Sequence, residues 1–306
     1  MARLSRQTKE IIKTTVVLLL VAALLYLYMI YPLNRVKAMW GRKDIDTYKL
    51  DLKQLPPNDR SAFDTAGVAI DTFRVESDGS TSLAGIFLRP EKTTALRGTV
   101  VLVPDERSER QSLAPLAKQF IDSGFSVVAY DQRATGLSSG KYHGDGEIES
   151  GDLDAIIGHL GVRNHLTPPV VVIGWKLGGD AAICAARDEK RISGVVAIEP
   201  YLTSRRQVDA YRVETGTWWV PLYRTVTWFW YNIRSGYGAS FLEADELKPV
   251  GCRTIIITSD QSSPAMQKLS QDSGRYLALQ PPFVDRNKLV GLVASFSGDL
   301  SDSNPK

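Results

Sequence analysis

The sequence predicts an α/β fold in which helices cover both faces of a mostly parallel sheet. Two short runs, GTVVLV at 98–103 and PVVVI at 169–173, are continuously apolar, as strands that are buried on both faces must be. Segments with the apolar spacing of helices separate such runs, which is the order expected of β-α-β units. A chain of 306 residues with 43% hydrophobic residues can bury a substantial core.

The first expected element is a membrane anchor. Residues 14–31 (TTVVLLLVAALLYLYMIY) are uncharged and would form a helix of roughly 27 Å, close to the thickness of the hydrocarbon layer. Tyr26, Tyr28 and Tyr31 gather at one end, as interfacial aromatic residues do. A cleaved signal peptide is the alternative, but the run is long and ends without a clear small-x-small cleavage site. The sequence therefore predicts a single-pass protein held in the lipid bilayer by residues 14–31.

The orientation of this anchor depends on the basic residues around it. Lysine and arginine residues lie on both sides of the run, so the positive-inside rule nearly cancels. The short N-terminal tail favours a soluble domain on the non-cytoplasmic side. The expected organisation is a tail at 1–13, the anchor at 14–31, a linker at 32–65, an α/β domain at 66–296 and a disordered polar tail at 297–306.

Within 66–296 the expected strands and helices alternate. Strands are expected at 68–75, 83–88, 98–103, 126–130, 169–173, 192–198, 254–258 and 276–279, and helices at 113–123, 148–160, 177–187, 265–271 and 287–296. The alternation stops at about 200–247, an aromatic-rich segment that includes Trp218 and Trp228. It lies where a cap can be inserted over the sheet edge at which α/β proteins bind ligands.

Charge and cysteine content exclude several classes of function. A net charge of +3 gives no basic patch for nucleic acid. Cys184 and Cys252 are far apart in the sequence, so they form neither a zinc-like cluster nor a disulfide framework, and we expect both to be buried small hydrophobic residues. No spacing of histidine, cysteine and carboxylate residues fits a metal site, and we expect no cofactor.

Four motifs carry a family resemblance. They are AYDQRATGLSSG at 129–140, GEIESGDLDAIIGHL at 146–160, IGWKLGGDAA at 173–182 and RSGYGASF at 234–241. In this order they resemble the α/β-hydrolase superfamily, closest to its monoacylglycerol-lipase and serine-aminopeptidase branch. The resemblance extends from about residue 68 to 296 and implies an α/β-hydrolase fold with an inserted cap at about 200–247. It also implies a serine on a tight strand-to-helix turn, an acid after a later strand and a histidine after the last strand.

The residues at these family positions do not form a working triad. Lys176 stands where the resemblance implies the serine nucleophile, and Asp260 stands at the position of the acid. The histidine should fall at 280–286, but no histidine follows His165 anywhere in the chain. The resemblance thus implies the turn of a serine hydrolase without its nucleophile or its base.

The oxyanion loop also departs from the family. It reads Pro104-Asp105 where the family usually has His-Gly, and a carboxylate there would repel the charge that an oxyanion hole stabilises. Lys176 could be a nucleophile only with a depressed pKa, which neighbouring anions such as Asp105 and Asp260 oppose. We expect instead that the Lys176 ammonium lies within about 4 Å of Asp260 or Asp105 as a buried ion pair.

A second catalytic arrangement is weaker. Ser138 and Ser139 follow the DQRATG motif, and His143 is the histidine nearest to them in sequence, but no residue is recognisable as the partner that would orient it. Asp131 is expected to anchor its loop. The two remaining histidines, His159 and His165, are expected at a helix end or on the surface.

The predicted function is binding rather than catalysis. A ligand pocket is expected around Pro104, Asp105, Trp175, Lys176, Leu177, Asp260, Trp218 and Trp228. The aromatic cap could pack a lid helix, contact the bilayer surface or enclose an apolar ligand. The sequence predicts a membrane-anchored, catalytically inactive member of the fold that binds a partner protein or an apolar small molecule. The alternative is an active hydrolase of esters or peptides with a non-standard site.

Overall fold

The computed structural model describes residues 5–41, 63, 67–91, 95–214, 216, 222–236, 251–259, 266–267, 276–279, 289–291 and 293. These residues belong to two units. The smaller unit comprises Met1–Gly41 and Val208–Ala239, and the larger comprises Arg42–Gln207 and Ser240–Lys306. The two units are described separately below.

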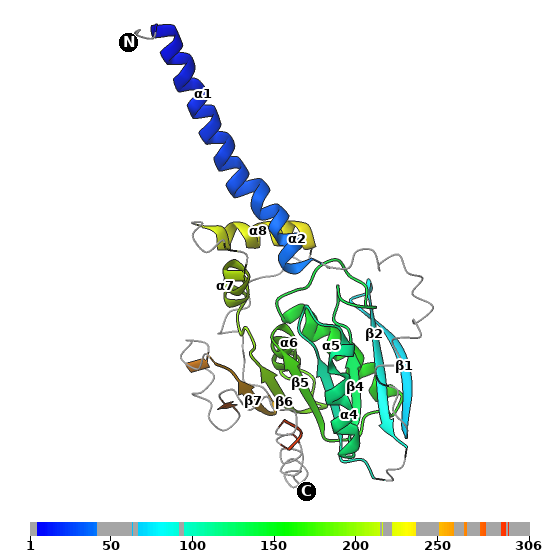
Figure 1. The fold of residues 1–306 in the computed structure, drawn as a ribbon. Helices are drawn as coiled ribbons and strands as arrows, with labels where there is room; N and C mark the ends of the chain where they lie inside the picture. Colours follow the sequence, from blue (N-terminus) through cyan, green and yellow to red (C-terminus); the bar gives the residue numbers. More distant parts are fainter. Residues whose placement is uncertain are drawn as a thin grey trace. The chain divides into compact units, whose positions relative to one another are not determined.

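The larger unit is built on an eight-stranded sheet with the order β1-β2-β4-β3-β5-β6-β7-β8 (Figure 1). The strands are β1 (Val68–Ser77), β2 (Thr81–Pro90), β3 (Thr99–Val103), β4 (Ser126–Tyr130), β5 (Val170–Trp175), β6 (Ile192–Ile198), β7 (Arg253–Ile257) and β8 (Tyr276–Leu279). β2 pairs antiparallel with β1 and β4, and all other pairs are parallel. The mostly parallel sheet is confirmed, and each expected strand is present.

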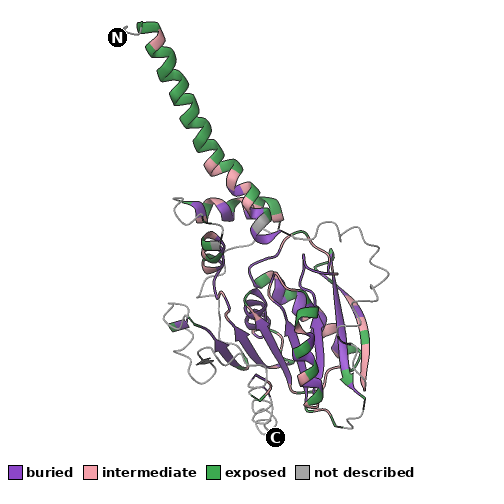
Figure 2. Ribbon diagram, viewed as in Figure 1, coloured by how far each residue is buried: buried purple, intermediate pink, exposed green. Residues whose placement is uncertain are grey.

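Helices cover both faces of this sheet, as predicted. They are α4 (Ala114–Asp122), which follows a 3₁₀ turn η3 (Arg110–Leu113), then α5 (Glu147–Val162) and α6 (Leu177–Ala185). Helix α7 (Ser204–Glu214) begins in this unit and ends in the smaller one. Apolar side chains of α5 and α6 join one core cluster, and those of α4 join a second cluster together with Leu289 and Val293. Figure 2 shows the central strands β3, β4, β5 and β6 buried and the outer sides of these helices exposed. Of the two helices predicted after β7, the described parts, 266–267, 289–291 and 293, are helical.

The two cysteines differ in burial. Cys184 on α6 is fully buried, which confirms the prediction for this residue, and Cys252 packs against the first of the two core clusters while only partly buried. Apolar surroundings thus account for Cys184 as a small hydrophobic side chain.

Parallel pairing brings the carboxyl ends of the central strands to one edge of the sheet. Val103 of β3 is level with Gly174 of β5, and Trp175 of β5 is level with Ile198 of β6. The loops that leave β3, β5 and β6 therefore emerge together. This is the edge at which open α/β sheets bind their ligands.

In the smaller unit, the N-terminal rod is a run of three helical segments: α1 (Arg6–Leu25), a π-helical turn η1 (Tyr26–Ile30) and α2 (Tyr31–Trp40). Its part Arg6–Lys37 is long and apolar enough to cross a membrane. Helix α8 (Tyr223–Ser235) belongs to the same unit. Residues 215, 217–221 and 237–247 of the predicted cap lie outside the described residues, so the cap stays a prediction.

The segment expected to be a linker begins at residue 32, and the rod continues through its first part to Trp40. A proline inside a regular α-helix removes a hydrogen bond and clashes with the carbonyl four residues earlier. Here Pro32 lies in the first turn of α2, directly after the π-helical turn, so the helix continues past it. Packing stabilises the extension, since Val36 and Trp40 are fully buried.

An aromatic cluster surrounds the end of α2. The Trp40 ring centroid lies 5.4 Å from that of Tyr211, 6.1 Å from Trp228 and 4.8 Å from Tyr231. Such contacts are worth about 0.5–1.5 kcal/mol each beyond the burial of their area. For Trp228, this placement supports the interpretation that the aromatic residues of the predicted cap pack a helix.

Candidate functional site

The turn between β5 and α6 has the backbone of a nucleophile turn with a lysine at its tip. Lys176 has φ 47° and ψ −114°, a region that a residue with a Cβ adopts only when its surroundings impose it. Two glycines make the tight turn possible. A Cβ on Gly174 would collide with the carbonyl of Gly178, and a Cβ on Gly178 with the carbonyl of Pro104.

Hydrogen bonds hold this strained conformation. The Lys176 amide donates to the Ile198 carbonyl over 2.9 Å, and the Lys176 carbonyl accepts from the amide of Asp180 over 3.0 Å. The first ties the tip to β6, and the second begins helix α6. The fold therefore imposes the turn through main-chain contacts that are independent of the side chain at its tip.

The Lys176 ammonium lies 3.7 Å from Oδ2 of Asp105, which confirms the predicted ion pair with this residue. The expected burial is wrong, because the Lys176 side chain is 45% exposed and that of Asp105 is 20% exposed. The turn lies at the open edge of the sheet, where an ammonium can stay hydrated and avoid the large cost of desolvation. A pair this exposed contributes at most about 1 kcal/mol.

The loop that carries Asp105 is held by polar contacts. Asp105 Oδ1 accepts from the Arg107 amide over 2.8 Å, and the buried side-chain amide of Gln132 donates to the Pro104 carbonyl. The second carboxylate oxygen of Asp105 is therefore directed to Lys176 by a loop that is fixed at both ends.

The expected ligand pocket is only partly brought together. Pro104, Asp105, Trp175, Lys176 and Leu177 lie at the end of the neighbouring strands β3 and β5, as predicted. Asp260 and Trp218 lie outside the described residues, and Trp228 belongs to the smaller unit. A cavity of about 140 Å³ opens elsewhere, beside α4, where Val68, Leu88 and Pro115 are among the residues that line it. None of the predicted pocket residues lines that cavity, so the predicted pocket stays a prediction.

Two further carboxylates near the turn were not predicted from the sequence. Glu106 Oε1 accepts a hydrogen bond from the Tyr201 hydroxyl over 2.8 Å. Asp180, in the first turn of α6, is buried and accepts from the amides of Tyr201 and Leu202 over 3.1 and 2.7 Å. Burial raises the pKa of Asp180 well above its ordinary value, and the charge of Glu106 raises it further. The one signal in the sequence that could have pointed to Glu106 is its position directly after Asp105.

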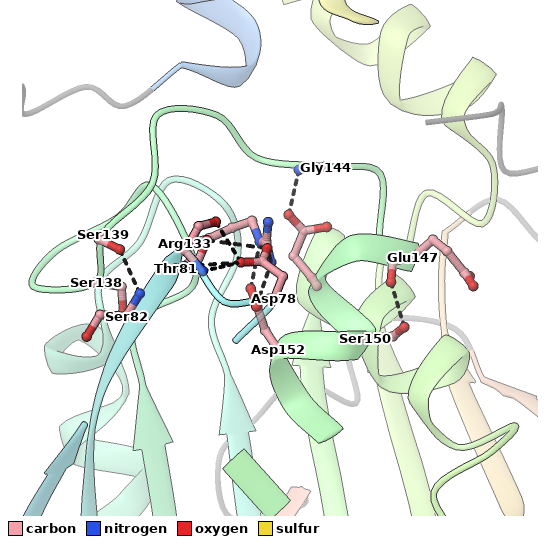
Figure 3. Close-up of polar contacts among 12 residues, drawn as sticks. Asp78, Thr81, Ser82, Arg133, Ser138, Ser139, Gly144, Glu147, Ser150 and Asp152 are labelled. Carbon is pink, nitrogen blue, oxygen red and sulfur yellow. Dashed lines mark hydrogen bonds and ion pairs between the residues drawn. The ribbon is translucent and has the colours of Figure 1, made fainter. Parts of the chain in front are cut away.

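The serine pair proposed as a second arrangement serves the loop instead. Ser138 Oγ donates to the Asp131 carbonyl over 2.5 Å and accepts from the Ala84 amide over 2.9 Å. Ser139 Oγ accepts from the Ser82 amide over 2.7 Å (Figure 3). Both hydroxyls thus fasten the loop after β4 to strand β2.

Asp131 anchors this loop, as predicted. Its carboxylate is buried, accepts from the amides of Arg110 and Leu137 over 2.8 and 2.9 Å, and pairs with the Arg110 guanidinium. A carboxylate used in this way holds two loops together at the sheet edge.

The three histidines of the chain have structural surroundings. His143 is buried, with Nε2 3.3 Å from the Thr135 hydroxyl. His159 lies in the last turn of α5, as predicted for a helix end, and His165 stacks on Phe87 with ring centroids 4.6 Å apart. In the part of the chain that is described, no group of three or more histidine, cysteine or acidic residues could hold a metal ion.

A buried charged network, also missed in the sequence, fixes the loop between β4 and α5. The Arg133 guanidinium donates to Asp152 over 2.6 and 2.7 Å and to Asp78 over 3.0 Å (Figure 3). The Glu149 carboxylate accepts from the amides of Gly144 and Gly146 over 2.5 and 3.0 Å. Burial raises the pKa of Glu149 to about 7, although the positive charge of Arg133 opposes this shift.

The strain at the turn gives a first testable prediction. Replacing Lys176 with glycine should raise the free energy of unfolding by about 1 kcal/mol relative to Lys176→Ala, because glycine adopts a positive φ without strain. Lys176→Ala itself should cost less than about 1 kcal/mol, since the ion pair is half exposed. Thermal denaturation of the two variants measures both differences. A loss of about 3–5 kcal/mol in Lys176→Ala would instead indicate the buried pair.

Comparison with known proteins places the chain by family and by fold. The family model described as serine aminopeptidase, S33, matches residues 94–252. An esterase from Pyrococcus furiosus is 17% identical with a TM-score of 0.59, and the match covers 80% of this chain and 94% of the esterase. An esterase from Exiguobacterium antarcticum is 14% identical with a TM-score of 0.54 over 74% of this chain and 100% of that chain. No curated protein matches the sequence.

Proposed function

Because the chain belongs to the serine aminopeptidase S33 family and has the α/β-hydrolase fold, we propose that it is a membrane-anchored member that binds rather than hydrolyses. It keeps the turn on which the family presents its nucleophile, and the tip of that turn is Lys176. Its proposed ligand is a partner protein or an apolar small molecule.

The observation that carries this proposal is the pairing of Lys176 with Asp105 over 3.7 Å. An ammonium paired with a carboxylate has no lone pair with which to attack a carbonyl carbon. The chain also has no histidine after His165, so another residue type stands where the family has its catalytic base. The chain thus has neither a serine nucleophile nor a histidine base at the two family positions that would have to act together.

The carboxylates around the turn also oppose acyl transfer. The tetrahedral intermediate of acyl transfer carries a developing negative charge, and losing a single oxyanion-hole donor costs about 10²–10³ in rate. Here Asp105 and Glu106 stand on the loop that would border the oxyanion. Their negative charge would raise the energy of that intermediate.

The anchor is the second part of the proposal. The rod segment Arg6–Lys37 is long and apolar enough to cross a bilayer, and the leucines of its α1 part are exposed, as lipid-facing side chains are. The proposed orientation keeps the soluble part on the non-cytoplasmic side.

An activity assay on the full-length protein in detergent tests the loss of catalysis. We expect no labelling by a fluorophosphonate probe and no turnover of p-nitrophenyl butyrate above a boiled sample. Lys176→Ser should restore neither, because a serine without a base is a weak nucleophile, and Lys176→Ala is the matched control. Turnover by the wild-type protein above the boiled sample would overturn the proposal in favour of an active hydrolase with a non-standard site. Native mass spectrometry tests binding, since a retained ligand adds mass.

A further inference from the structure

We propose that α8 is a second membrane contact, which lies in the plane of the bilayer surface beside the anchor. The contact is made by the outer face of α8, defined as Leu222, Val226, Phe229 and Ile233. This inference rests on the anchoring part of the proposed function, and its test separates the failure of one from the failure of the other.

The outer face of α8 is apolar and exposed. Leu222 is 74% exposed, Phe229 55% and Ile233 57%. Within the helix, the half-buried Val226 together with Phe229 and Ile233 follows the three- and four-residue steps of one face, and Leu222 directly precedes the helix. A soluble protein leaves single apolar residues exposed, but a row on one helix marks a surface that meets another apolar phase.

The opposite face of α8 is already used. Tyr223, Trp228 and Tyr231 are buried, and α8 packs against α2 with its N-terminal end near η1. The Tyr223 ring lies 6.2 Å from that of Tyr31. One face thus fixes the helix to the rod, and on the outer face the Phe229 ring touches the neighbouring Trp230 ring while more than half of Phe229 stays exposed.

The position of α8 on the rod matches an interfacial helix. Figure 1 shows α8 lying across the rod beside α2, at the end where the exposed apolar stretch of α1 and η1 stops. If α1 spans the bilayer, a helix that crosses it at this end lies near the membrane surface. An amphipathic helix in that place buries its apolar face at the boundary of headgroups and acyl chains.

Charges around α8 favour an anionic lipid surface. Arg35 and Lys37 lie on α2, and Arg234 lies exposed in the last turn of α8. Basic residues near an anionic bilayer attract its headgroups. Aromatic residues are also abundant here, and tryptophan and tyrosine prefer the interface. The acyl chains of a bilayer therefore match the apolar outer face of α8, and its anionic headgroups match the basic residues around it.

The test places an environment-sensitive fluorophore on the outer face in the full-length protein. Phe229→Cys, and separately Ile233→Cys, is labelled with a nitrobenzoxadiazole dye in a Cys252→Ala background. Cys184 can stay, because burial raises the pKa of its thiol well above the ordinary value and keeps it unreactive. The protein is reconstituted in vesicles of phosphatidylcholine and phosphatidylglycerol, with or without lipids that carry a doxyl quencher near the headgroup.

Two further labels are the controls. Val162→Cys labels an exposed valine of α5 in the larger unit, and Val21→Cys labels an exposed valine within α1. The shallow quencher should reduce the fluorescence of the Phe229 and Ile233 labels at least about twofold more than that of the Val162 label. Quencher at the middle of the acyl chains should act on the Val21 label instead.

The outcomes separate the two proposals. A Val21 label that no lipid quencher reaches would overturn the anchor. A quenched Val21 label with outer-face labels that emit as in water would overturn the interfacial role of α8 alone. Outer-face labels that emit as in an apolar medium but resist the lipid quencher would also overturn it, since protein then covers this face. Equal quenching at Val162 would mean that the vesicle attracts the protein without a specific contact.

Discussion

Replacing Trp40 with alanine should lower the free energy of unfolding of the smaller unit by about 3–5 kcal/mol, the usual cost of removing a large buried aromatic side chain. The indole is fully buried and contacts three other rings, from α7 and α8. Its removal leaves a cavity at the junction of three helices, which the rigid aromatic neighbours cannot fill by relaxing.

Denaturant unfolding in detergent, followed by near-ultraviolet circular dichroism, measures this loss. Phe229→Ala is the matched control, because it removes an aromatic ring from the exposed side of α8 and should cost less than about 1 kcal/mol in detergent. Trp40→Phe should lose less than half as much as Trp40→Ala, since a phenyl ring keeps part of the contacts. A Trp40→Ala variant within 1 kcal/mol of the wild type would show that the aromatic cluster does not hold the unit together.

The second large effect is a change of stability with pH that depends on Glu149. The pKa of this buried carboxyl is raised from 4.5 to about 7 by burial. The folded state therefore favours the protonated acid, and the associated stability is fully present below the unfolded pKa. It is lost as the pH rises through 7, by about 3 kcal/mol in total at 1.36 kcal/mol for each pH unit between the two pKa values.

Glu149→Gln should remove this dependence, because glutamine stays neutral at every pH. Relative to the wild type, the variant should gain about 3 kcal/mol between pH 4.5 and pH 8, on top of a constant loss from the hydrogen bonds to Gly144 and Gly146. Urea unfolding across this pH range measures the difference. Glu147→Gln, which changes an exposed neighbour on the same helix, is the control. Parallel stability curves for the wild type and Glu149→Gln would contradict the prediction.

The sheet was predictable because its central strands β3, β4 and β5 are buried on both faces. Continuous apolar runs such as 169–173 leave no polar side for water, so the strands could be assigned without knowing their partners. The turn at Lys176 was predictable for a related reason, since Gly174 and Gly178 must be small wherever strand and helix backbones approach so closely.

Burial and long-range pairing were not predictable. The exposure of Lys176 depends on how open the sheet edge is, which no local pattern reports. Glu149 and Asp152 are charged residues that normally face solvent, and the partner of Asp152, Arg133, lies 19 positions away along the chain. Trp40 fell in a segment expected to be a linker, because nothing near it in sequence shows the rings that it contacts.

The unbroken run from Arg6 to Trp40 has a mechanical consequence. The Trp40 ring packs against rings of α7 and α8. Because Val36 and Trp40 are both buried, packing holds the C-terminal end of the rod in place. A membrane helix adjusts its tilt to the local thickness of the bilayer. If α1 spans the bilayer, a change of its tilt in a thinner or thicker membrane would move the aromatic cluster of the smaller unit with it, because Trp40 at the end of the rod contacts rings of α7 and α8.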